Sequence, residues 1–107
     1  YIHLDDATEN SATLKLSVIG SINVSLKTSF SIYTPTRFGS PSLTISAGGN
    51  EISKTTGASG TAKTTNYNDV TCDGSLSSTN PTIKFNRTYF AGREGEVYIK
   101  ALLITYR

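Results

Sequence analysis

The sequence contains no methionine or tryptophan, and it has one cysteine, Cys72, and one histidine, His3. A single cysteine excludes an intramolecular disulfide, and we interpret Cys72 as an unpaired, structurally ordinary thiol. Zinc sites usually take four cysteine or histidine ligands, so one residue of each kind argues against zinc. His3 lies near the chain end, and no Gly-x-Ser-x-Gly motif accompanies it. We therefore expect no catalytic residue, no metal, no cofactor and no enzyme activity.

Charge is sparse and nearly balanced. Ten lysine and arginine residues face eight aspartate and glutamate residues, which gives a formal net charge of +2. The basic residues are scattered from Lys15 to Arg107, so we expect no nucleic-acid binding. No apolar run approaches the roughly 20 residues of a membrane-spanning helix, and no signal peptide is visible, so we expect no membrane insertion. Because the chain starts with Tyr1, we interpret residues 1–107 as one domain cut from a longer protein.

Two neighbouring runs, Thr13–Ile19 and Ile22–Ile32, alternate apolar with polar residues and are separated by Gly20–Ser21. A period of two predicts strands with one buried face. The short break between the runs predicts that they form an antiparallel hairpin.

Weaker patterns cover most of the remaining chain. Residues 1–10 are interpreted as a first short strand or as the end of a shaft or connector. Further strands are expected over Ser42–Ser46, from residue 51 after a tight turn at Gly48–Asn50, briefly over Val70–Cys72, and over Thr82–Phe90. Asp73–Gly74 is expected to end the brief strand, and residues 57–68 and 75–81 are expected to form polar loops.

The last run, Glu96–Tyr106, is apolar on both predicted faces. Strict alternation places Val97, Ile99, Ala101 and Leu103 on one face and Tyr98, Leu102, Ile104 and Tyr106 on the other. A strand that is apolar on both faces should be covered on both faces. We therefore predict that the second set contacts another subunit, with half-exposed side chains as the alternative.

Many short strands at regular spacing, without a helical period, predict the fold class. We expect an all-β domain, an antiparallel β-sandwich or a jelly-roll-like fold with no substantial helix.

Recognition is the function that the remaining residues favour. Aromatic and arginine side chains dominate binding hot spots, and tyrosine stacks on ligands while its hydroxyl forms hydrogen bonds. The expected loops and strand ends offer seven candidates for receptor binding: Tyr33, Arg37, Phe38, Tyr67, Arg87, Tyr89 and Arg93. Ordinary packing at strand ends is the alternative for these residues.

The segment Ala12–Ile32 resembles the first hairpin of viral fibre heads, since adenovirus fibre heads open with a similar strand, glycine turn and long alternating strand. The segment Val97–Tyr106 is similar to the aliphatic and aromatic strand on which these heads end. Phage tail-needle knobs and other tumour-necrosis-factor-like trimers share that closing pattern.

The resemblance implies a compact receptor-binding head, or knob, at the tip of a viral or phage fibre. It implies a homotrimer that is preceded by a shaft or coiled coil and attaches to a host-cell receptor, either protein or glycan. The location would be the virion surface, which is extracellular when the head acts. Two alternatives stay open: a monomeric carbohydrate-binding or adhesin-type β-sandwich, and a structural capsid or pilus module.

Overall fold

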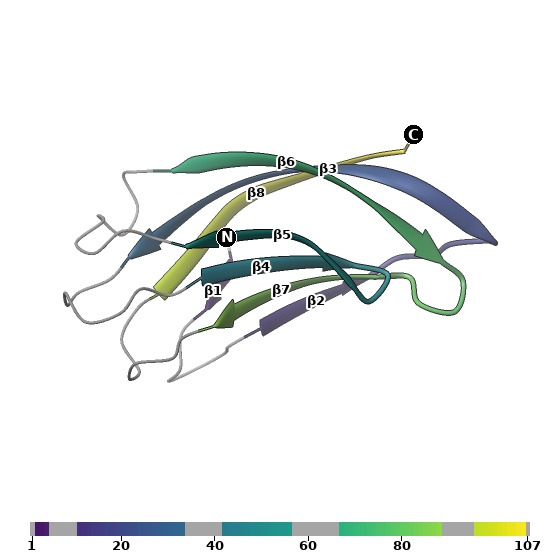
Figure 1. Cartoon of the computed structure of the whole chain (residues 1–107), viewed down its shortest axis with the longest axis horizontal. Coiled ribbons are helices and arrows are strands. Elements are labelled where there is room, and N and C mark those ends of the chain that lie inside the picture. The colour runs from purple at the N-terminus through teal and green to yellow at the C-terminus, as the bar shows by residue number, and fades with distance from the viewer. Residues whose placement is uncertain (1, 5–10, 34–41, 57–66, 89–95, 107) are drawn as a thin grey trace.

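The structure, a computed structural model, describes residues 2–4, 11–33, 42–56, 67–88 and 96–106. These residues form eight strands and no helix, arranged in two layers (Figure 1). The strands are β1 (Ile2–Leu4), β2 (Ser11–Lys15), β3 (Ser21–Tyr33), β4 (Ser42–Ala47), β5 (Asn50–Thr56), β6 (Asn68–Ser77), β7 (Thr82–Thr88) and β8 (Glu96–Tyr106).

Each layer is a four-stranded antiparallel sheet. Sheet A has the order β1-β8-β3-β6, and sheet B has the order β2-β7-β4-β5. Within this order the first strand of the chain pairs with the last, the second with the seventh, the third with the sixth and the fourth with the fifth. Such nested pairs, folded over into two sheets, form a jelly roll. The predicted all-β antiparallel sandwich is therefore confirmed.

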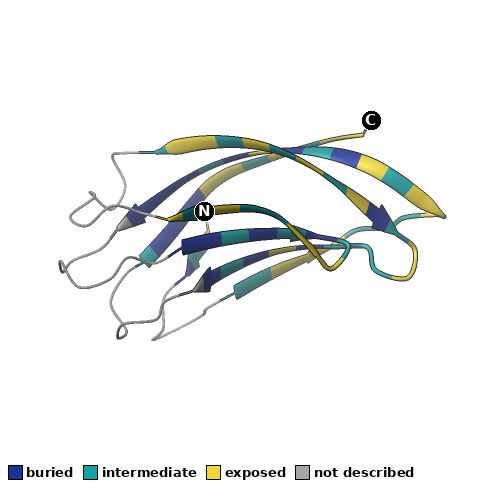
Figure 2. Ribbon diagram, viewed as in Figure 1, coloured by how far each residue is buried: buried dark blue, intermediate teal, exposed yellow. Residues whose placement is uncertain are grey.

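The core lies between the two sheets and follows the alternation in the sequence. From Val24 to Ile32 in β3 every second side chain is buried, and the residues between them are Lys27 and three serines, of which Ser31 is also buried. Figure 2 shows the same alternation along β4 and β7. The core consists of Leu4, Val24, Leu26, Phe30, Ile32, Leu43, Ile45, Ala47, Leu76, Ile83, Phe85, Val97 and Ile99. Burial of a leucine- or phenylalanine-sized side chain contributes about 1.5–3 kcal/mol.

The predicted hairpin between the first two alternating runs is wrong. β2 pairs with β7 in sheet B, whereas β3 pairs with β6 and β8 in sheet A. Residues 16–20 connect the sheets and are tied to the β6–β7 turn, because Leu16 N donates to Pro81 O and Ser78 N donates to Gly20 O. Gly20 has a φ of 69°, which favours glycine, but it lies in a connection between sheets rather than in a two-residue hairpin turn.

The expected hairpin around Gly48–Asn50 is confirmed, with β4 paired to β5. Asp73–Gly74, by contrast, does not end a strand, because β6 continues to Ser77. Gly74 allows β6 to approach sheet B closely. A Cβ atom at this position would lie 2.8 Å from the Cβ atom of Ala47 and 3.2 Å from Cδ1 of Ile52. The glycine therefore serves the packing of the two sheets and not a turn.

The bounds predicted for the last strand are confirmed, but its alternation is wrong beyond Ile99. Phe30 pairs with Ile99 and Ser29 pairs with Ala101, so Lys100 is an extra residue in β8. Such a bulge reverses the two faces of the strand that follows it. Leu102 and Ile104 therefore pack against the core, and Ala101 and Leu103 lie on the outer face instead.

Candidate functional site

The large apolar side chains that are exposed among the described residues all come from strands at one lateral edge of the sandwich or from the connection between them, and Leu103 points from the outer face of sheet A there. These are Ile2, Leu14, Ile19, Leu103 and Tyr106, with 39, 39, 95, 60 and 65% of their surface exposed. They belong to β1, to β2, to the β2–β3 connection and to β8. β1 and β2 are edge strands of their sheets. We call these five residues the β1–β2–β8 side. Exposed apolar residues that gather in a contiguous patch are typical of interaction sites, whereas single exposed residues are ordinary.

A second set of apolar residues lies beneath the β1–β2–β8 side and is only partly covered. Leu16 and Val18 follow β2, and Leu102 and Ile104 belong to β8; all four pack against the core without full burial. β1 pairs only with Val97–Ile99, so within the described chain no strand pairs with the outer edge of β8 beyond Ile99. A free strand edge offers unpaired backbone groups to another chain.

The opposite lateral side, formed by β5 and β6 and facing the viewer in Figure 1, is different. Its edge strands expose Glu51, Lys54, Asp69 and Asp73. Charged residues on an edge strand discourage pairing with another chain. The closing stretch of β8, residues 101–106, contains no charged residue. Among the described residues, β5 and β6 therefore expose charged side chains that the closing stretch of β8 lacks.

A row of aromatic residues crosses the outer face of sheet A near the strand ends. The rings of His3 and Tyr98 are stacked, and His3 Nε2 lies 2.9 Å from Glu96 Oε1. Nearby, Lys100 Nζ lies 4.7 Å from the centroid of the Tyr67 ring. A cation over an exposed aromatic ring contributes about 0.5–1 kcal/mol. One face of each of the three rings is therefore already occupied by a neighbouring side chain.

The structure separates the seven receptor candidates. Arg37, Phe38, Tyr89 and Arg93 lie outside the described residues. Tyr33 is the last residue of β3 and pairs with Glu96 in the ladder. Tyr67 precedes β6 and contacts Lys100, as described above. Arg87 lies within β7 rather than on a loop and is buried, on the strand face that carries Ile83 and Phe85. Receptor contact by these residues stays a prediction.

The four interface candidates also differ in their surroundings. Tyr98 is buried beside His3, whereas Leu102 and Ile104 face the core. Tyr106 is exposed and belongs to the β1–β2–β8 side. Their contact with another subunit stays a prediction. The sequence did not identify Ile2, Leu14, Ile19 and Leu103 as exposed apolar residues. For Ile19, its position directly before the expected break at Gly20 was a visible sign of exposure.

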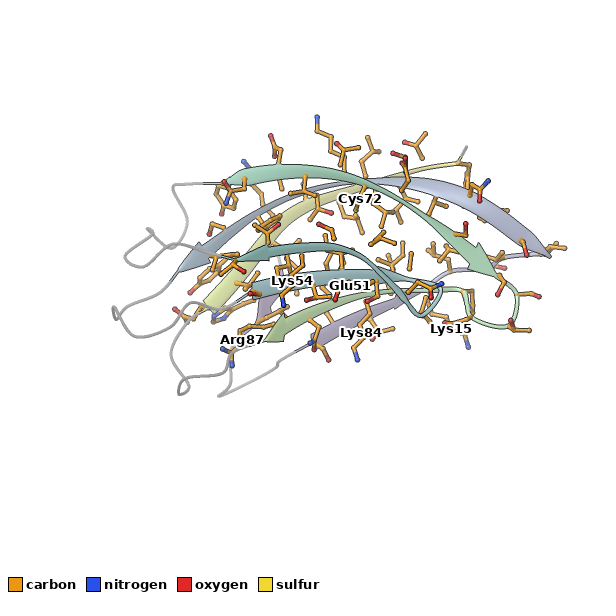
Figure 3. The ribbon with its side chains drawn as sticks, in the orientation of Figure 1. Lys15, Glu51, Lys54, Cys72, Lys84 and Arg87 are labelled. Atoms are coloured by element: carbon orange, nitrogen blue, oxygen red, sulfur yellow. The ribbon has the colours of Figure 1, made fainter. Side chains whose placement is uncertain are left out.

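Among the described residues, no three histidine, cysteine, aspartate or glutamate side chains gather to hold a metal ion. Cys72 is free and packs against the core; burial, and secondarily the charge of Asp73, raises the pKa of its thiol. On sheet B, Figure 3 shows Lys15, Lys54 and Lys84 on three strands, together with Glu51. This surface is polar and carries both signs of charge.

The described part of the chain contains no helix that could span a membrane. No protein-family model, no curated protein and no solved structure matches the chain.

Proposed function

We propose that this domain is the receptor-binding head of a viral or phage fibre, that it acts as a homotrimer, and that it attaches the particle to a protein or glycan on the host-cell surface. It would lie at the tip of the fibre on the virion surface.

The observation that carries the proposal is the nested order of the eight strands, the jelly roll. Jelly rolls recur in viral capsid proteins and in lectins. In lectins, the two sheets form a rigid support for a ligand-binding site. This support is an analogy between folds, because one fold hosts many functions. The closing strand β8, which the resemblance to fibre heads singled out, is an eleven-residue strand within sheet A.

Trimerisation agrees with the size and composition of the domain. A 107-residue chain with 36% hydrophobic residues has a modest core. Association stabilises a folded domain by mass action, because copies bind the folded state and not the unfolded one. Most soluble oligomers are closed, symmetric assemblies of identical chains, of which threefold rings are one class.

Competition for attachment tests the function. The isolated domain is mixed with host cells before the particle that carries the fibre is added, and the fraction of adsorbed particles is measured. The proposal predicts that adsorption falls with increasing domain concentration and that heat-unfolded domain has no effect. If the folded domain neither binds the cells nor lowers adsorption, the proposed function is wrong.

A second candidate is a monomeric carbohydrate-binding or adhesin-type module. The row formed by His3, Tyr98 and Tyr67 on sheet A favours it, because aromatic rings stack on sugars. In the structure, however, His3 covers one face of Tyr98, and Lys100 lies over Tyr67. A monomer that binds glycans, with affinity lost in Tyr67→Ala, would favour this candidate. Assembly end to end or into a lattice would favour a structural capsid or pilus module.

A further inference from the structure

We propose that the outer face of sheet B binds a linear acidic polysaccharide, one that carries sulfate or carboxylate groups, on the host-cell surface. The inference rests on the proposed attachment function and names the class of receptor. Three lysines on three different strands carry it: Lys15 ends β2, Lys54 lies in β5 and Lys84 lies in β7 (Figure 3). All three side chains are exposed.

The register of sheet B brings two of these lysines together. Lys15 lies opposite Thr82, and Lys84 lies opposite Thr13, so the two lysines are diagonal neighbours on β2 and β7. They point to the outer face, because the residues on either side of Lys84 belong to the core. Diagonal neighbours lie about 7–8 Å apart, within reach of long side chains. Like charges at this distance repel each other, and an anion held between them relieves the repulsion.

The three lysines lack carboxylate partners. In the part of the chain that the structure describes, none of them forms an ion pair. Glu51, which lies in line with Lys84 across β4, is the one carboxylate that the described residues place on this face. The part of the face around Lys84 borders the connections 16–20, 48–49 and 78–81, which are all described. Three ammonium groups beside one carboxylate give the described face a positive charge, and ammonium groups donate strong hydrogen bonds to anionic oxygen atoms.

The outer face of sheet A provides the contrast. Lys27 on β3 has Asp69 and Asp73 as its diagonal neighbours on β6. Together with Glu96 and Lys100, the described residues place three carboxylates and two ammonium groups on this face. Among the described residues, the excess of positive charge is therefore confined to sheet B.

The side chains between the lysines favour a sugar chain over other anions. Thr13, Thr44, Ser46 and Asn86 lie on this face and can donate and accept hydrogen bonds, as sugar hydroxyl groups do. The described residues of the face include no aromatic ring on which a nucleobase could stack. They also include no large apolar side chain that could enter a membrane. An acidic polysaccharide needs neither.

Binding to immobilised heparin, which carries both sulfate and carboxylate groups, tests the inference at about 0.15 M salt. We expect the domain to bind heparin and not neutral dextran, and the affinity to fall as added salt screens the charges. Lys15→Gln and Lys84→Gln in one variant should weaken binding by at least about tenfold, the effect of losing charge-assisted hydrogen bonds. Adding Lys54→Gln should weaken it further. The matched control combines Lys27→Gln and Lys100→Gln on sheet A; it removes the same total charge and should bind almost as well as the wild type.

The outcomes separate this inference from the proposed function. Circular dichroism shows that each variant is folded. Equal losses in the sheet A and sheet B variants would overturn the proposed face, because binding would then follow total charge alone. A wild-type domain that lowers particle adsorption but does not bind heparin would overturn the polysaccharide and leave the attachment function intact. A domain that binds heparin through sheet B but does not lower adsorption would support the face as a polysaccharide site and overturn its role in attachment. Tighter binding to DNA or to phosphatidylserine vesicles than to heparin would overturn the inference in favour of a different partner.

Discussion

The imidazole ring of His3 lies flat on the phenol ring of Tyr98, with ring centroids 4.4 Å apart and planes 5° apart. The two residues are opposite each other in the β1–β8 ladder. The Oε1 atom of Glu96, at the start of β8, lies 2.9 Å from Nε2 of His3. A strand of three residues forms few backbone hydrogen bonds. The outward side chain of His3, together with Leu4 on the inner face, therefore holds β1 on sheet A.

His3→Ala should therefore lower the free energy of unfolding by about 1 kcal/mol, because aromatic pairs contribute roughly 0.5–1.5 kcal/mol beyond their buried area. His3→Phe keeps the stacked ring and loses the contact with Glu96, so it should retain most of the stability. Chemical denaturation of the three proteins gives the comparison. An equal loss in His3→Ala and His3→Phe would show that the stacking contributes nothing.

Gly74→Ala should destabilise the fold by about 1–3 kcal/mol, the usual effect of overpacking. The added methyl group would lie 2.8 Å from the Cβ atom of Ala47, across the interface between the sheets. Ala47→Gly in the same chain removes that clash, so the double variant should lose less stability than the two single changes added together. Strict additivity in this double-mutant cycle would contradict the proposed contact.

Thr28→Val should stabilise the domain by about 1 kcal/mol. Thr28 is fully buried in β3, and its Oγ1 finds no hydrogen-bond partner among the residues that the structure describes. Burying a hydroxyl group without a hydrogen-bond partner is unfavourable, whereas a methyl group of similar size packs in the apolar core without that cost. The midpoint of denaturant unfolding is the measurement. A clear loss of stability in Thr28→Val would mean that the hydroxyl is bonded.

Cys72 should react slowly with iodoacetamide near neutral pH. Burial and the neighbouring Asp73 raise the pKa of its thiol, and the thiolate is the reactive form. A raised pKa shifts ionisation to higher pH, so the alkylation rate should continue to rise in the pH range where an ordinary cysteine peptide has reached its plateau. The unfolded protein in denaturant is the matched control and should behave like the peptide. A plateau at lower pH than the peptide's would contradict the burial of this thiol.

The alternation in the sequence predicted where the strands lie better than it predicted which strands pair with each other. The runs that became β3, β4 and β8 were located from their apolar period, since that period reports which side chains face the core. It does not report which strand lies alongside, and so Thr13–Ile19 was paired with the wrong partner. The predicted hairpin required only a glycine break, whereas the structure uses that break to change sheets.

The candidate surface depended on two features that a local pattern does not contain. The bulge at Lys100 reverses the faces of β8, which moves Leu103 outward and Leu102 inward. Strand order then brings β1, from the start of the chain, beside β8 at its end. The proximity of the edge strands β1 and β2, which carry Ile2 and Leu14, to β8 therefore becomes visible only once the sheets are assembled.

The native mass of the isolated domain, measured by light scattering behind size exclusion, tests the central claim most directly. The account predicts a single species near three times 11.5 kDa, the mass of the chain. A species that stays at 11.5 kDa at every concentration would contradict the trimeric head. The exposed side of β1, β2 and β8 would then be the surface of a monomer.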